Sequence, residues 1–219
     1  MKRGHIKEID RWGMIEKLMR FPEMCEEALS FRVEPPKQKI SRVVLAGMGG
    51  SGIAGDLIRD WLDPSIPMET CKGYLLPNWV DGETLVVATS YSGNTEETLS
   101  CFSDAMRRDA ALIGITSGGK LEEECNKFGK PLIKIPPGLP PRVALPYLFF
   151  STVVIMKECG IVSRRDEEIR ESIKTLRELR EKMDPEIENN RAVVVAKKIK
   201  DTIPFIYAPP PLYGAAKRF

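Results

Sequence analysis

The sequence predicts an α/β protein in which a parallel β-sheet is covered by helices on both faces. Short apolar runs rich in Val, Ile and Leu alternate with longer segments whose apolar residues recur at helical spacing. Several of these runs end in turns rich in Gly, Ser and Thr, which mark the point where a buried strand gives way to a helix. Strands separated by helices in this way pair in parallel, because each helix returns the chain to the edge where the previous strand began.

The elements can be placed in order along the chain. Apolar residues recur at helical spacing over 6–29, and Pro22 is expected to interrupt this segment because proline lacks a backbone N–H. The expected strands are RVVLAGMG (42–49), PMETCK (67–72), ETLVVATS (83–90), AALIGITSGG (110–119) and PLIKIP (131–136). The expected helices are SGIAGDLIRDWL (51–62), TEETLSCFSDAMRR (95–108), LEEECNKFG (121–129) and the long apolar VALPYLFFSTVVIMKECG (143–160), which suits a core or an interface.

The remainder of the chain has a different composition. Residues 161–200 are highly charged and are expected to form helices separated at Asp184-Pro185. IPFIYAPP (203–210) is expected to form the first strand of a second unit, and APPPLYGAAKRF (208–219) to run from a loop into a helix. We therefore expect an N-terminal domain over 1–160, a helical linker over 161–200 and the beginning of an incomplete second domain over 201–219.

Composition narrows the class of protein. The net charge is +2 with no basic block, which argues against a nucleic-acid partner, and no apolar run approaches the roughly 20 residues of a membrane span. The N-terminal MKRGHIKEIDRW lacks the apolar core of a signal peptide. The single histidine, His5, leaves little scope for a His-based metal site or triad, and we expect no metal or other cofactor. The five cysteines form no C-x-x-C pair and suggest reduced thiols in a cytoplasmic protein; they are Cys25, Cys71, Cys101, Cys125 and Cys159.

Three loops carry the residues most suited to ligand binding. They are GMGGSG after Leu45, SYSGNT after Val87 and TSGG after Ile115, and each leads from the end of a strand into a helix. Ligands of open parallel sheets bind at this edge, and a helix N-terminus with free N–H groups favours an anion. The small hydroxyl side chains add donors, so we expect Ser51 from the first loop to form a phosphate cradle with three residues of the second: Ser90, Ser92 and Thr95.

Two other interpretations of these loops remain open. In the first, Asn94 caps the following helix and Glu97 returns the bond, which is a structural role without a ligand. In the second, Gly47, Gly49 and Gly52 form a G-x-G-x-x-G dinucleotide motif. That motif needs an acid at the end of the next strand, where Lys72 stands instead.

The two main loops also resemble a known family. GMGGSGIAGD (47–56) and SYSGNTEET (90–98) look like the paired loops of a sugar isomerase (SIS) domain, and PPRVALPYL (140–148) is similar to a Pro-Arg segment of the bifunctional phosphoglucose/phosphomannose isomerases. IPFIYAP and YGAAKRF resemble the start of the second SIS domain of that family. The resemblance implies a three-layer αβα sheet and covers essentially the whole chain.

The resemblance also implies roles for individual residues. Arg142 would stabilise the enediolate that forms during aldose–ketose isomerisation of glucose 6-phosphate or mannose 6-phosphate to fructose 6-phosphate, which the family performs without a metal. The family's general base and ring-opening histidine follow the stretch that matches AAKRF, so they would lie beyond Phe219, and we expect this chain to isomerise poorly. The residues that would hold the substrate phosphate are Gly49, Gly50, Ser51, Ser90, Ser92, Gly93, Asn94 and Thr95.

The resemblance has consequences for partners as well. Its site is built across two subunits, so a homodimer is expected, and the apolar helix over 143–159 suits an interface. The alternative function is a sugar-phosphate sensor that binds without catalysis; residues 1–34 are too short and too weakly basic for a DNA-binding module, so such a sensor would act through a protein partner. The sequence leaves open the preference between glucose and mannose substrates and the identity of any substitute base.

Overall fold

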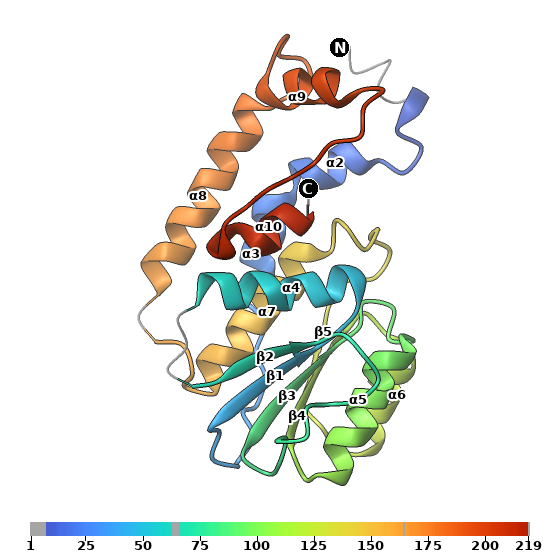
Figure 1. Cartoon of the computed structure of the whole chain (residues 1–219), viewed down its shortest axis with the longest axis vertical. Helices are drawn as coiled ribbons and strands as arrows, with labels where there is room; N and C mark the ends of the chain where they lie inside the picture. The colour runs from blue at the N-terminus through green and yellow to red at the C-terminus, as the bar shows by residue number, and fades with distance from the viewer. Residues whose placement is uncertain (1–7, 63–65, 164, 219) are drawn as a thin grey trace. The chain divides into compact units, whose positions relative to one another are not determined.

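Five parallel strands form one sheet in the computed structural model, which describes residues 8–62, 66–163 and 165–218 (Figure 1). The order across the sheet is β2-β1-β3-β4-β5, so the two strands that precede the main loops, β1 and β3, lie side by side. The order along the chain agrees with the one predicted. The strands are β1 (Arg42–Ala46), β2 (Met68–Cys71), β3 (Thr84–Thr89), β4 (Ala111–Thr116) and β5 (Leu132–Lys134).

Helices cover both faces of this sheet. Helices α4 (Gly49–Trp61) and α7 (Leu145–Glu158) lie on one face, whereas α5 (Glu96–Arg107) and α6 (Gly119–Lys127) lie on the other (Figure 1). Each helix follows the strand after which the sequence predicts it. The three-layer α/β class expected from the sequence is confirmed.

The centre of the sheet is fully apolar because its strands are covered on both sides. Every residue of β3 and of β4 is buried, which explains why these strands show continuous apolar runs rather than alternation. Helix α7 is also buried over nearly its whole length. Its apolar surface is therefore covered within this chain, and its composition does not require a partner subunit.

The contacts of the chain divide it into two compact parts. The sheet part comprises residues 27–163 and 208–219. It includes a short 3-10 turn, η1 (Pro210–Leu212), and α10 (Tyr213–Arg218), which packs on α4. The loop and helix expected at the end of the chain are thus present.

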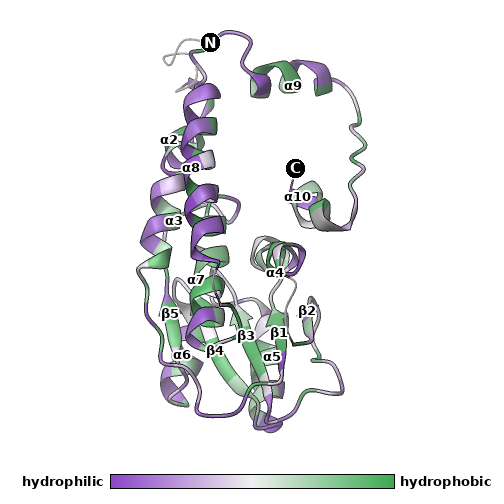
Figure 2. Ribbon diagram, turned by 90° about the vertical axis from the view of Figure 1, so that its left-hand side faces the viewer, coloured by the Kyte–Doolittle hydropathy of each residue, from purple (hydrophilic) through white to green (hydrophobic). Residues whose placement is uncertain are grey.

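The other part comprises residues 1–26 and 164–207. Helix α2 (Met14–Met19) ends just before Pro22, and α3 (Phe21–Leu29) begins there, so the expected interruption is confirmed. Helices α8 (Asp166–Lys182) and α9 (Arg191–Ile199) follow, separated at Asp184-Pro185 as predicted. Figure 2 shows that α8 is mostly hydrophilic, in contrast to the apolar strands of the sheet.

The strand predicted over 203–210 is wrong: the structure has no strand between residues 203 and 209. This segment is extended, and the side chains of Ile203, Phe205 and Tyr207 are 83%, 79% and 90% exposed. A strand forms only when its backbone groups pair with a neighbour. None of the described strands pairs with this segment, so its β-branched and aromatic residues do not make it one.

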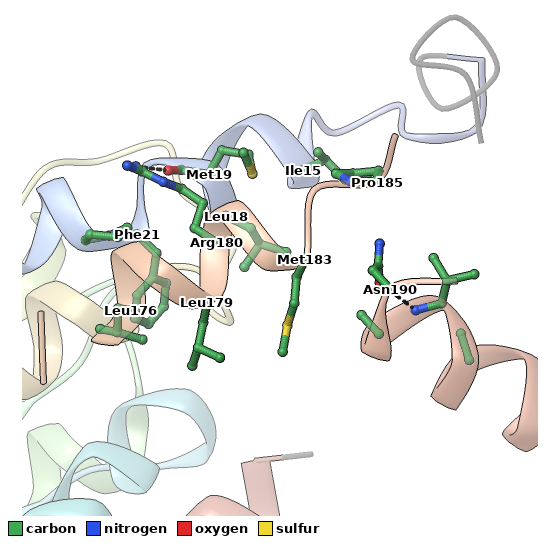
Figure 3. Close-up of a pocket in the computed structure, with 14 residues that line it drawn as sticks. Ile15, Leu18, Met19, Phe21, Leu176, Leu179, Arg180, Met183, Pro185 and Asn190 are labelled. Carbon is green, nitrogen blue, oxygen red and sulfur yellow. Dashed lines mark hydrogen bonds between the residues drawn. The ribbon is translucent and has the colours of Figure 1, made fainter. Parts of the chain in front are cut away.

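An apolar groove of about 570 Å³ lies in the part of the chain that contains α8 and α9 (Figure 3). Its lining includes Leu18 and Met19 of α2 together with Leu176, Leu179 and Met183 near the end of α8. The polar lining side chains, Arg180 and Asn190, are engaged with Glu23 and with the first turn of α9. This lining does not suit a sugar phosphate.

Two further findings bear on the class of protein. None of the described helices combines the length and the apolar character needed to cross a bilayer. All five cysteines are free, and four are buried, as the sequence suggests. His5 lies outside the described residues.

Candidate sugar-phosphate site

The three predicted loops meet at the carboxyl edge of the sheet. Ala46 of β1 pairs in register with Ala88 of β3, and Thr89 pairs with Ile115 of β4. The three strands therefore end at the same level, and α4, α5 and α6 each begin beside this edge. Three helix N-termini bring their partial positive charge to one place, which favours an anion.

Ser51 connects the first loop with the second. Its Oγ accepts a hydrogen bond of 3.2 Å from the backbone N–H of Tyr91, 40 positions away in the sequence. In the second loop the Ser90 and Thr95 hydroxyls lie 2.8 Å apart. Ser90 is 1% exposed, whereas Ser92 is exposed. The structure thus places Ser51 against the second loop and leaves the Ser92 hydroxyl accessible to a ligand.

Asn94 does not cap α5, and that structural interpretation is wrong. The N-cap residue is Thr95, and no side-chain bond closes the helix. Asn94 instead accepts a 3.2 Å hydrogen bond from the Lys120 N–H at the start of α6, and it donates to the Ser92 carbonyl. The third loop lies within reach of Asn94 because β3 and β4 are neighbours, and this proximity cannot be read from local sequence.

The backbone amides of the second loop are partly engaged within it. The Gly93 N–H donates to the Ser90 carbonyl at 3.1 Å, and the Asn94 N–H donates to the Ser92 Oγ at 3.3 Å. Gly49 and Gly50 form the first turn of α4, where backbone N–H groups have no partner within the helix. The backbone N–H groups of the first loop are therefore more available to a ligand than those of the second loop.

Gly93 permits a close approach of the second and third loops. Its φ is +72°, and a Cβ at this position would lie 1.7 Å from the carbonyl oxygen of Gly118. Only glycine fits such a position, since the neighbouring atom belongs to the backbone and cannot turn away. The loops remain joined by the Leu121 N–H, which donates to the Gly93 carbonyl at 2.9 Å.

Tyr91 is a positioning residue that the sequence analysis missed. Its hydroxyl donates to the Pro136 carbonyl at 3.0 Å and accepts from the Leu139 N–H at 2.7 Å. Burial raises the pKa of Tyr91, so the phenol keeps the proton that it donates. This side chain ties the second loop to the segment that leads to Arg142. The sequence signal that could have identified Tyr91 is its position as an aromatic residue between two serines of the loop.

Arg142 lies beside the first loop, but among the described residues its side chain forms no hydrogen bond with the cradle hydroxyls. The carbonyl of the preceding Pro141 would be 3.2 Å from a Cβ at Gly50, so the two segments are adjacent. Arg142 is exposed, and its Nη1 donates to the Arg218 carbonyl at 3.4 Å. Arg218 in turn donates to the Arg142 carbonyl.

The nearby acids are engaged in structural contacts. Asp56 is 2% exposed and pairs with Lys72, at the end of β2, and with Lys217 of α10. Glu96 and Glu97 occupy the first turn of α5, where they complement the helix dipole. Lys72 thus stands where a dinucleotide site would need its ribose-binding acid, and its partner is Asp56.

Comparison with known proteins identifies relatives of this chain. A bifunctional phosphoglucose/phosphomannose isomerase of Caldicellulosiruptor bescii is 41% identical over 202 residues, which cover 89% of this chain and 60% of that protein. The chain is a relative of the bifunctional phosphoglucose/phosphomannose isomerases. Three more proteins of that name are 34–40% identical over 81–93% of the chain. The chain spans just over half of their length, between 53% and 61%.

One further relative and one solved structure are also similar to this chain. A D-glucosamine-6-phosphate 4-epimerase of Sulfolobus acidocaldarius is 38% identical over 140 residues, covering 64% of this chain and 44% of that protein. The solved structure of an Escherichia coli tagatose-6-phosphate ketose/aldose isomerase shares the fold, with a TM-score of 0.54 and 16% identity over 94% of this chain and 60% of that one. No protein-family model matches the chain.

Proposed function

We propose that the chain binds a sugar phosphate at the joined loops, which are the first and second loops connected through Ser51. We propose that it belongs to an enzyme that interconverts glucose 6-phosphate or mannose 6-phosphate with fructose 6-phosphate. The observation that carries this proposal is the hydrogen bond between the Ser51 Oγ and the Tyr91 N–H, because it holds two helix N-termini around one point. The phosphate contacts Ser51, Ser92 and the free amides of Gly49 and Gly50. The Ser90 and Thr95 hydroxyls interact with each other and stabilise the second loop.

Isomerisation moves a proton between C1 and C2 through an enediolate. Arg142 lies beside the first loop, and its guanidinium stabilises the negative charge that develops on the sugar oxygens. The proton is moved by a carboxylate base, which the family carries shortly after the stretch that matches AAKRF. The contact between Arg142 and the last turn of α10 supports a position of that stretch near the reacting carbons.

We further infer that residues 201–219 begin a second SIS domain and that the enzyme is a cytoplasmic homodimer. The free thiols suit a reducing compartment. The dimer is inferred from the family resemblance alone. The apolar composition of α7 adds no support, because this helix is covered by its own chain. Size-exclusion chromatography with light scattering measures the subunit number, and a monomer at all concentrations contradicts the inference.

Ser92→Ala tests the phosphate site. We expect glucose 6-phosphate to raise the melting temperature of the 219-residue chain and Ser92→Ala to lose most of that shift. Ser103→Ala is the matched control, because Ser103 is also exposed but lies within α5 and bonds only the Leu99 carbonyl. A full shift in Ser92→Ala contradicts the assignment, and stabilisation by NAD but not by sugar phosphate would favour the dinucleotide interpretation.

A second candidate is binding without isomerisation. Among the described residues, no carboxylate or histidine contacts the cradle hydroxyls or the Arg142 guanidinium. A coupled assay for fructose 6-phosphate decides between the two functions, since a binder shows the melting shift and forms no product. Removal of a general base typically costs ~100- to 10,000-fold in rate, so the assay must detect turnover at that level.

A further inference from the structure

Helix α10 is fixed on α4 by contacts that leave little freedom. The Gly214 N–H donates to the Asp60 carboxylate at 2.5 Å, and the Lys217 ammonium lies 3.4 Å from the buried Asp56 carboxylate. A Cβ at Gly214 would lie only 3.0–3.2 Å from atoms of α4, including the backbone N of Leu57. These contacts with α4 therefore fix the position of the last turn of α10 within the sheet part of the chain.

This last turn brings a second arginine to Arg142. Each of the two side chains donates to the backbone carbonyl of the other, so the guanidinium of Arg218 lies beside the segment that carries Arg142. Arg218 is half-buried. Burial and the charge of Arg142 both lower the pKa of Arg218, which shows that the neighbourhood disfavours its positive charge.

Within the described residues, neither arginine has an acidic partner. Across residues 8–62, 66–163 and 165–218, no carboxylate forms an ion pair or hydrogen bond with either guanidinium. Most other buried or half-buried charges of the sheet part are paired, as in the contacts of Asp104 with Arg108 and of Asp56 with Lys72. Two adjacent cations repel each other, and an anion bound between them removes that cost.

We propose that Arg218 and Arg142 together form an anion subsite that binds the C1–C2 end of the sugar phosphate as it becomes negatively charged. The inference rests on the proposed function, since it assumes that the phosphate lies at the joined loops. It deepens that function by assigning substrate recognition to α10. Paired guanidiniums match the two oxygens of an enediolate or of a carboxylate, because each arginine presents a planar fork of N–H donors.

The test compares two linear ligands that differ only in charge at C1. 6-Phosphogluconate carries a carboxylate there and resembles the enediolate, whereas glucitol 6-phosphate carries a neutral alcohol. Titration calorimetry on the 219-residue chain measures both affinities for wild type, Arg218→Met, Arg218→Lys and Arg107→Met. Arg107→Met removes the same charge from the far end of α5, where the side chain is 71% exposed. Melting curves without ligand verify that each variant is folded.

We expect Arg218→Met to lower the affinity for 6-phosphogluconate about 10-fold, which corresponds to ~1.4 kcal/mol of binding free energy. We expect the same variant to change the affinity for glucitol 6-phosphate less than about 2-fold. Arg218→Lys keeps the charge but loses the fork, so it falls between Met and wild type. Arg107→Met leaves both affinities unchanged.

Three results overturn the inference. If Arg218→Met weakens both ligands equally, Arg218 does not read the C1 charge. If it weakens neither, the pair is not a binding site. If wild type binds neither ligand, the proposed phosphate site fails, and the subsite fails with it; the first two results leave the proposed function standing.

Discussion

Replacement of Gly93 by Ala is expected to separate the second and third loops. Gly93 has a φ of +72°, and the new Cβ would lie 1.7 Å from the Gly118 carbonyl oxygen. Gly49 provides a matched control: its φ is +49°, yet a Cβ there meets no atom within 4 Å. Both variants place alanine in left-handed backbone, but only Gly93→Ala adds a collision.

The magnitudes follow from these two contributions. Left-handed backbone costs a non-glycine residue roughly 1–2 kcal/mol, which is the whole expected effect of Gly49→Ala. The collision adds an overpacking term of about 1–3 kcal/mol, because a backbone oxygen must move by more than an ångström. Gly93→Ala should therefore destabilise the protein by roughly 2–5 kcal/mol. At about 2–4 °C per kcal/mol for a chain of this length, its melting temperature should fall by ~4–20 °C.

Two measurements verify this reasoning. Thermal melting followed by circular dichroism compares the two variants with wild type. Hydrogen exchange of the Leu121 amide, which donates to the Gly93 carbonyl, reports the loop contact directly. Equal melting temperatures for Gly93→Ala and Gly49→Ala, together with unchanged Leu121 protection, would refute the account of a close loop contact.

Two other substitutions test the contacts that hold the site. Tyr91→Phe removes the hydroxyl that bonds Pro136 and Leu139, and we expect a loss of about 1–2 kcal/mol in urea unfolding and faster exchange of the Leu139 amide; unaltered exchange would contradict the positioning role. Asp104→Asn removes a buried carboxylate that accepts from Arg108 at 2.8 Å, which should cost about 1–3 kcal/mol at pH 7. Burial alone would raise the pKa of Asp104, but hydrogen bonds from the neighbouring arginines lower it overall, so its stabilisation is present above the ordinary aspartate pKa of 3.8 and is lost as the pH falls below it. Melting curves at pH 7 and pH 3 should therefore differ more for wild type than for Asp104→Asn, and an equal difference in both proteins would show that Asp104 contributes nothing to acid unfolding.

The incorrect predictions share a physical cause. Residues 203–209 have the composition of a strand, but a strand also needs a neighbour to pair with its backbone, and the described part of the chain offers none. Asn94 and Glu97 have the spacing of a helix cap, yet the Asn94 side chain turns to the Lys120 amide because that donor lies close in space. In both cases a tertiary neighbour, or the lack of one, decides between local alternatives.

The sequence by itself determined the order of strands and helices, the α/β class and the loops that carry hydroxyl groups. These features depend on hydrophobic periodicity and on glycine placement, which act over a few residues. Only the tertiary structure decided that Ser51 meets Tyr91, that Tyr91 holds the segment before Arg142, and that Arg218 lies beside Arg142. Each of these contacts joins residues from different elements, so it depends on sheet order and helix packing, which no local pattern encodes.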